Sequence, residues 1–126
     1  MDNFFSFFEE KGLFNTCGTD YVTCYDTRHK RFRVKSIHVV RFPDYIVETP
    51  YRESFRKETW TLFWDSLSSE EHALAKTCPE DCGFFEFLRE TGLIEKHYAA
   101  YQAAAEKAIK FWMADNGITE LHTVIA

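Results

Sequence analysis

Four cysteines are the residues of this 126-residue chain whose type and spacing could hold a metal ion. Two pairs of thiolates can complete a tetrahedral zinc site. Cys78 and Cys82 fall within the spacing of zinc knuckles, but Cys17 and Cys24 are further apart than the usual pair of zinc-binding cysteines. Cysteine is also often buried as a small apolar residue. We therefore expect no metal and no cofactor, with a site of Cys17, Cys24, Cys78 and Cys82 as the less favoured alternative.

Catalytic motifs are missing from the sequence. The histidines are scattered, and neither H-E-x-x-H nor G-x-S-x-G occurs. Glu86 and Glu90 lie one helical turn apart, a spacing that is more typical of a solvated helix surface than of a general acid and base. The five glycines are dispersed, so no phosphate-binding loop is formed. These absences favour a protein that is not an enzyme; a small enzyme with a site assembled from dispersed residues is the second alternative.

Positive charge is concentrated in residues 28–41, which hold six of the fifteen Lys and Arg residues and no carboxylate. The whole chain has a net charge of −5. Such segregation directs association with oppositely charged surfaces. It predicts a macromolecular partner, a protein with an acidic surface, that contacts Arg28, Lys30, Arg31, Arg33, Lys35 and Arg41. The alternative is a nucleic-acid-binding module that uses this strand, with Phe32 or Tyr25 stacking on bases, although such modules are usually basic overall.

Aromatic residues are unusually frequent, with 13 Phe, 6 Tyr and 3 Trp. Rings of this kind are enriched in interfaces as well as in cores. Phe4 and Phe8, one turn apart in the N-terminal segment, are therefore a secondary candidate interface, with burial in the domain as the favoured alternative.

Length and hydropathy bound the remaining possibilities. A chain of this size forms one domain by default, here residues 1–126. The N-terminus lacks a basic region before its short apolar stretch, and no run approaches the roughly 18 apolar residues of a membrane span. We expect a cytoplasmic protein with no membrane contact; the oligomeric state is left open.

Strands are expected in the first half of the chain. Asp2 is expected to cap a helix over residues 3–11 that Gly12 ends. Alternating and β-branched residues predict strands, with a bulge near Ser36 where the alternation slips. The expected strands are 21–26, 31–42 and 45–49, and the tail 118–126 could add another.

Helices are expected in the second half. Residues 53–67 have strand propensity but helical spacing, and a helix is favoured. Ser68 and Glu71 match a capping box, and Pro79 suits the first turn of a helix that ends at Gly92. A long helix over 94–116 carries an apolar stripe of Ile94, Tyr98, Tyr101, Ala105, Ala108 and Trp112.

The expected fold class is therefore α+β, with a small antiparallel sheet of about three strands from the N-terminal half packed against helices from the C-terminal half. The expected function is that of a non-enzymatic interaction protein, an adaptor or an inhibitor of a larger macromolecule. Small accessory proteins of phages and plasmids that block a host machine are of this general kind.

Overall fold

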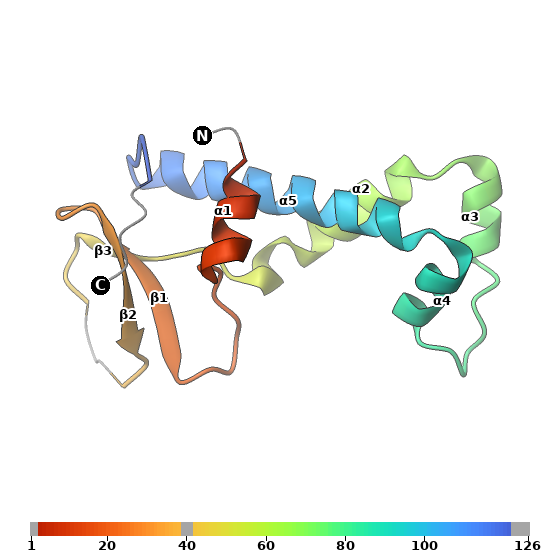
Figure 1. Ribbon diagram of the computed structural model, residues 1–126, viewed down its shortest axis with the longest axis horizontal. Coiled ribbons are helices and arrows are strands. Elements are labelled where there is room, and N and C mark those ends of the chain that lie inside the picture. Colours follow the sequence, from red (N-terminus) through yellow and green to blue (C-terminus); the bar gives the residue numbers. More distant parts are fainter. Residues whose placement is uncertain (1–2, 39–41, 122–126) are drawn as a thin grey trace. The chain divides into compact units, whose positions relative to one another are not determined.

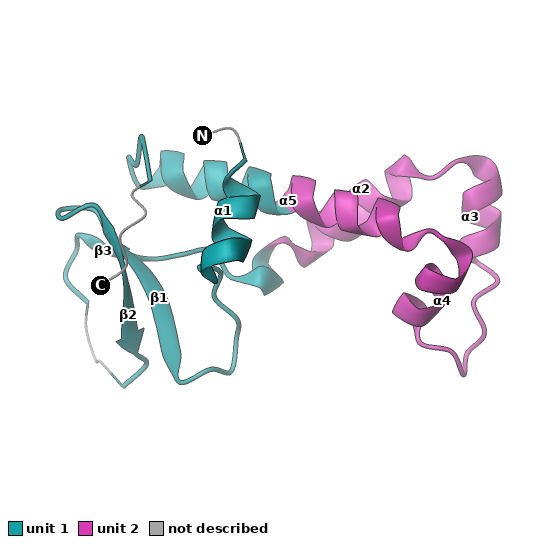
Figure 2. Cartoon of the chain, viewed as in Figure 1, with its two compact units in different colours: residues 1–54, 105–126 teal, residues 55–104 magenta. Residues whose placement is uncertain are grey.

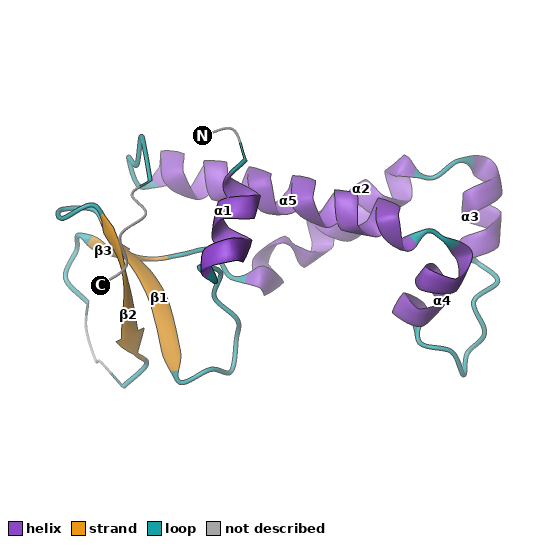
Figure 3. Cartoon of the chain, in the orientation of Figure 1, coloured by secondary structure: helices purple, strands orange, loops and turns teal. Residues whose placement is uncertain are grey.

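The computed structural model describes residues 3–38 and 42–121 of the chain. It confirms the α+β class: a three-stranded antiparallel sheet from the N-terminal half, followed by helices (Figures 1 and 3). The elements are α1 (Phe4–Lys11), β1 (Tyr21–Asp26), β2 (Arg31–Ser36), β3 (Ile46–Glu48), a 3-10 turn η1 (Arg52–Phe55), α2 (Arg56–Ser66), α3 (Ser69–Ala75), α4 (Phe84–Thr91) and α5 (Ile94–Asp115).

The chain forms two compact units (Figure 2). Unit 1 comprises residues 1–54 and 105–126, and unit 2 comprises residues 55–104. The helix α5 contributes its first half to unit 2 and its second half to unit 1. This one helix belongs to both units, and the single domain over 1–126 stays a prediction.

The sheet has the strand order β2-β1-β3, and both pairings are antiparallel. The expected first strand and the turn after it are confirmed. The second strand ends at Ser36, where the alternation of apolar residues is lost, and the expected bulge is replaced by a turn over Ile37 and His38. Residues 39–41 of the expected strand lie outside the described part. No strand forms over residues 118–121, and residues 122–126 of the expected tail strand lie outside the described part.

Unit 1 has an aromatic core between one face of the sheet and the helices α1 and α5. The ring of Phe8 packs against Phe14, Phe32 and Trp112 with centroid distances of 5.0, 5.9 and 6.1 Å. Tyr25 packs edge-on against Phe32 and Trp112. These contacts join the N-terminal helix, the sheet and the end of α5 into one core.

The helix α1 begins one residue later than expected. The side chain of Asn3 accepts a hydrogen bond from the N–H of Ser6 and caps the helix, whereas Asp2, the expected cap, lies outside the described residues. Glu106 of α5 accepts the N–H groups of Phe4 and Phe5 at 3.1 and 2.7 Å. The first turn of a helix has free N–H groups and a partial positive charge, so both side chains stabilise it. Gly12 ends the helix with a φ of 65°, as expected.

Unit 2 is a set of short helices around a small core. The core is formed by Phe63, Leu67, Ala75, Leu88, Leu93 and Ala100. The ambiguous segment 53–67 is helical, and the capping box between Ser68 and Glu71 is confirmed. Pro79 does not begin a helix: it lies in a turn closed by a hydrogen bond from the N–H of Cys82, and α4 begins only after Gly83.

The apolar stripe expected along α5 is displaced. Tyr98 is 54% exposed, and the buried positions are Ala100, Ala104, Ala105, Ile109 and Met113. Small alanine side chains let neighbouring segments approach the helix closely, whereas a tyrosine ring needs room and a polar neighbour for its hydroxyl. The alanines therefore form the buried face, and the larger rings of Tyr101 and Trp112 lie half-buried beside it.

Candidate functional site

The predicted basic residues lie on the hairpin of β1 and β2, except Arg41, which is outside the described residues. Arg28 and Lys30 are exposed in the turn. The other three, on β2, are half-buried rather than fully exposed. We call the five described residues the basic hairpin: Arg28, Lys30, Arg31, Arg33 and Lys35.

The register of the strands places three of these cations on one face of the sheet. Arg31, Arg33 and Lys35 lie opposite Asp26, Cys24 and Val22. Directly opposed residues in an antiparallel pair point to the same face. This face is therefore the one opposite the aromatic core, since Phe32 points from β2 into that core and is fully buried.

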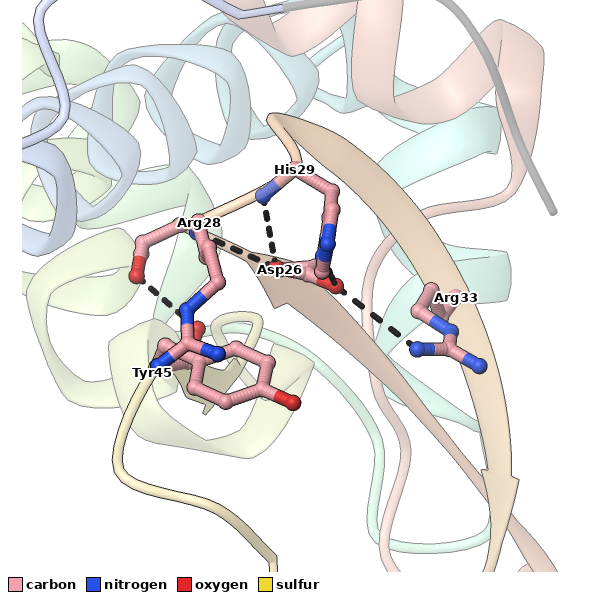
Figure 4. Close-up of polar contacts among 6 residues, drawn as sticks. Asp26, Arg28, His29, Arg33 and Tyr45 are labelled. Atoms are coloured by element: carbon pink, nitrogen blue, oxygen red, sulfur yellow. Dashed lines mark hydrogen bonds and ion pairs between the residues drawn. The ribbon is translucent and has the colours of Figure 1, made fainter.

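Asp26, the last residue of β1, organises the turn of the hairpin (Figure 4). Its side chain is fully buried. Its Oδ1 accepts the N–H groups of Arg28 and His29 at 3.0 and 2.9 Å. Its Oδ2 lies 2.8 Å from His29 Nδ1 and 3.6 Å from a guanidinium nitrogen of Arg33. One buried carboxylate thus holds both the backbone of the turn and two side chains.

The pKa of Asp26 reflects this environment. Burial alone would raise the pKa, because it disfavours a charged carboxylate. The hydrogen bonds from the backbone and ring of His29, with a further one from the N–H of Arg28, outweigh burial and hold the pKa of Asp26 below its ordinary value. Asp26 is therefore ionised at neutral pH.

The Arg28 side chain is held by an aromatic ring. Its guanidinium carbon lies 4.0 Å from the centroid of the Tyr45 ring, a cation–π contact. The carbonyl of Tyr45 accepts hydrogen bonds from the N–H and hydroxyl of Thr27, which fixes the ring beside the turn. The His29 ring also contacts Tyr45, with a centroid distance of 6.1 Å. Tyr45 therefore joins Arg28 and His29 on one side of the turn.

Sequence reasoning missed Asp26, His29 and Tyr45. A local signal for Asp26 was present, because an Asp or Asn side chain commonly accepts backbone N–H groups two and three residues later in a turn. No local signal identifies Tyr45. It lies directly before β3, about twenty residues after the turn that it contacts.

The aromatic residues considered as binding residues are mostly buried. Phe8 is fully buried in the core of unit 1, and Phe4 is half-buried. Phe32 and Tyr25, considered for stacking on bases, are 0% and 2% exposed. These two rings do not form a stacking surface beside the basic hairpin.

The cysteines do not form one group. Cys17 is exposed and Cys24 is buried in unit 1, while Cys78 and Cys82 are half-buried in unit 2. Among residues 3–38 and 42–121, no three His, Cys, Asp or Glu side chains gather as metal ligands do. Within the same residues, no helix has the length and apolar character that a membrane crossing requires.

Cys24 should resist alkylation in the native protein, whereas Cys17 should react. Burial, together with the charge of Glu48, raises the pKa of the Cys24 thiol to about 11 despite the nearby Lys35 and Arg33. Only the thiolate is a good nucleophile. Iodoacetamide at pH 8, followed by peptide mass spectrometry, should label Cys17 well before Cys24, and denaturant should abolish the difference. Equal native labelling rates would contradict this placement.

No family model, curated protein or solved structure matches this chain. The class that the fold defines is an α+β protein with a basic hairpin ordered around a buried carboxylate.

Proposed function

We propose that this chain is a non-enzymatic interaction protein, an adaptor or an inhibitor, whose basic hairpin binds an acidic surface of a larger protein. The observation that carries the proposal is the weak internal neutralisation of the hairpin. Within the described residues, Arg33 is the one cation of the five that has a carboxylate within ion-pair distance. Four cations are thus left for an external partner.

The arrangement of these cations also supports the proposal. Asp26 and Tyr45 hold the turn, so Arg28 and the neighbouring Lys30 are presented by an ordered backbone. Ordering before binding reduces the entropy that association costs. Arginine predominates in the hairpin, and its planar fork of donors suits carboxylates at an interface.

The nucleic-acid alternative has less support. Base stacking by aromatic side chains is the usual companion of a basic groove. Phe32 and Tyr25, the two residues on which that alternative depended, are buried and are not accessible for stacking on bases. Measuring binding to DNA and RNA at several salt concentrations tests the nucleic-acid alternative directly.

Reversing the charge of Arg28, Lys30 and Lys35 to Glu should abolish partner binding while the fold is retained. The changes at Lys30 and Lys35 should each alter the stability by no more than about 0.5 kcal/mol, and loss of the cation–π contact of Arg28 should cost about 0.5–1 kcal/mol. The partner would first be isolated by affinity purification from the native host, and binding kinetics would then be measured at several salt concentrations. For an acidic protein, the association rate of the wild type should fall as salt rises, while the dissociation rate changes less.

The matched control replaces Arg56, Lys57 and Arg89 with Glu. These are three exposed cations of unit 2, so the change in net charge is the same. Partner binding should survive this control. Wild-type kinetics in the hairpin variant would refute the proposal. Binding of single- or double-stranded DNA or RNA with a steep logarithmic salt dependence would instead favour the nucleic-acid alternative.

A further inference from the structure

The contacts of Asp26 determine which nitrogen of His29 is available to a ligand. His29 Nδ1 faces the buried carboxylate at 2.8 Å, and the His29 side chain is 52% exposed. A carboxylate partner keeps the proton on Nδ1, so Nε2 is the acceptor of the neutral ring and becomes a second donor when the ring is protonated. Asp26 therefore orients the imidazole so that Nε2 is the nitrogen available to a ligand.

Two arginines flank this imidazole. Arg28 shares the Tyr45 ring with His29, and Arg33 shares Asp26 Oδ2 with it. Figure 4 shows Arg28 and Arg33 on opposite sides of Asp26. Arg33 approaches Asp26 with one nitrogen at the long distance of 3.6 Å, so most of its five N–H donors stay unused by that contact. The cation–π contact of Arg28 with Tyr45 is likewise not a hydrogen bond and uses none of the N–H donors of its guanidinium.

We propose that Arg28, His29 and Arg33 form a binding site for a phosphate monoester. The proposal rests on the function proposed above and names the acidic group that the hairpin recognises as a phosphorylated side chain of the partner protein. A phosphate monoester carries about −1.5 to −2 charges at neutral pH and offers three acceptor oxygens. Two guanidinium groups and an imidazole supply donors of the matching kind.

A phosphate monoester fits this site better than a carboxylate or a phosphodiester. It carries more negative charge than either and offers three acceptor oxygens to the donors of Arg28, His29 and Arg33. A carboxylate or a phosphodiester carries a single negative charge and offers only two such oxygens. The hydrogen bonds of the turn and the nearby Arg33 offset part of the charge of Asp26 and so reduce its repulsion of the ligand.

Asp26 is a positioning residue in this site. It would not touch the phosphate; it orders the turn through two backbone N–H groups and orients the imidazole through Nδ1. The site therefore depends on a buried group that carries a charge of the same sign as its ligand.

NMR titration of the full chain with inorganic phosphate tests the site without any partner. The Cε1–Hε1 signal of His29 should shift and saturate as phosphate is added. The signals of His72 in unit 2 should not change in this way. Phenyl phosphate should reproduce the effect, whereas diphenyl phosphate and acetate should bind at least about tenfold more weakly, the loss expected for one charge-assisted hydrogen bond.

Variants separate a formed site from general charge attraction. His29→Gln and Arg28→Gln should each weaken phosphate binding about tenfold. Arg56→Gln, which removes an exposed cation of unit 2, should leave it unchanged. Non-saturating shifts that are equal at all exposed histidines, or equal losses in all three variants, would overturn the proposal.

Peptides then identify the source of the phosphate. A phosphoserine peptide should bind more tightly than its unphosphorylated or glutamate counterpart, and phosphatase treatment of the isolated partner should weaken its binding.

If the partner depends on the basic hairpin but phosphate does not bind and phosphatase has no effect, this inference fails and the proposed function stands. If phosphate saturates His29 while the charge-reversed hairpin still binds the partner, the proposed function fails and the site stands. Tighter binding of a 5′-phosphorylated oligonucleotide than of the phosphopeptide would overturn the assignment to a protein.

Discussion

Replacing Phe8 with alanine should lower the free energy of unfolding by about 3–5 kcal/mol, the usual cost of removing a buried phenylalanine. The ring is fully buried, and it contacts Phe14, Phe32 and Trp112, which come from the loop after α1, from β2 and from α5. A helix of eight residues is too short to be stable alone, so α1 depends on these contacts. Urea unfolding followed by tryptophan fluorescence and far-ultraviolet circular dichroism would measure the change.

The matched control is Phe4→Ala, one turn earlier on the same helix and half-buried. Its cost should be clearly smaller. The same pair of variants tests the alternative in which Phe4 and Phe8 contact a partner. A change below about 1 kcal/mol in Phe8→Ala, together with loss of partner binding, would assign Phe8 to an interface rather than to the core.

Local patterns predicted many boundaries correctly. The β-branched and aromatic residues of 21–26 define β1, and Gly12 and Gly92 end α1 and α4 with a positive φ that an L side chain rarely adopts. The capping box of Ser68 and Glu71 begins α3, because both of its hydrogen bonds lie within four consecutive residues. Each of these features depends on neighbours in the sequence, which explains why the sequence was sufficient.

Features that depend on distant residues were not predicted. Glu106 caps α1 from about a hundred residues away, and nothing in either segment indicates the other. Pro79 was expected to begin a helix because its fixed φ suits a first turn, but the same φ also suits the turn that it occupies. The stripe on α5 was displaced because periodicity identifies apolar rows, whereas close packing selected the row of alanines.

The candidate site likewise combines features that local sequence predicted with features that depend on distant residues. The alternation of β2 correctly placed Arg31, Arg33 and Lys35 on one face. Their degree of burial and the pairing of Arg33 required the register with β1, which brings Asp26 to this face. Charge counting along the chain therefore identified the surface but not the carboxylate that orders it.

Replacing Asp26 with asparagine should lower the free energy of unfolding at pH 7 by about 1–3 kcal/mol, the usual cost of leaving a buried hydrogen-bonding group without its partner. Asparagine preserves the shape and an acceptor for the turn, but it removes the charge that faces His29 and Arg33. The effect should depend on pH with a definite sign. The pKa of Asp26 is lower in the folded protein than the ordinary value of 3.8 that applies to the unfolded chain.

A carboxyl group with a lowered folded-state pKa contributes stability above its unfolded-state pKa and loses it as the pH falls through the folded-state pKa. The difference in stability between the wild type and Asp26→Asn should therefore shrink as the pH falls below the unfolded-state value of 3.8. Urea unfolding at a series of pH values would measure this difference, with Asp44→Asn, an exposed carboxylate of the same unit, as the control. A difference that stays constant down to pH 2, or one no larger than that of the control, would show that the charge of Asp26 does not order the basic hairpin. In that case the backbone hydrogen bonds to Oδ1, which asparagine retains, would account for the turn by themselves.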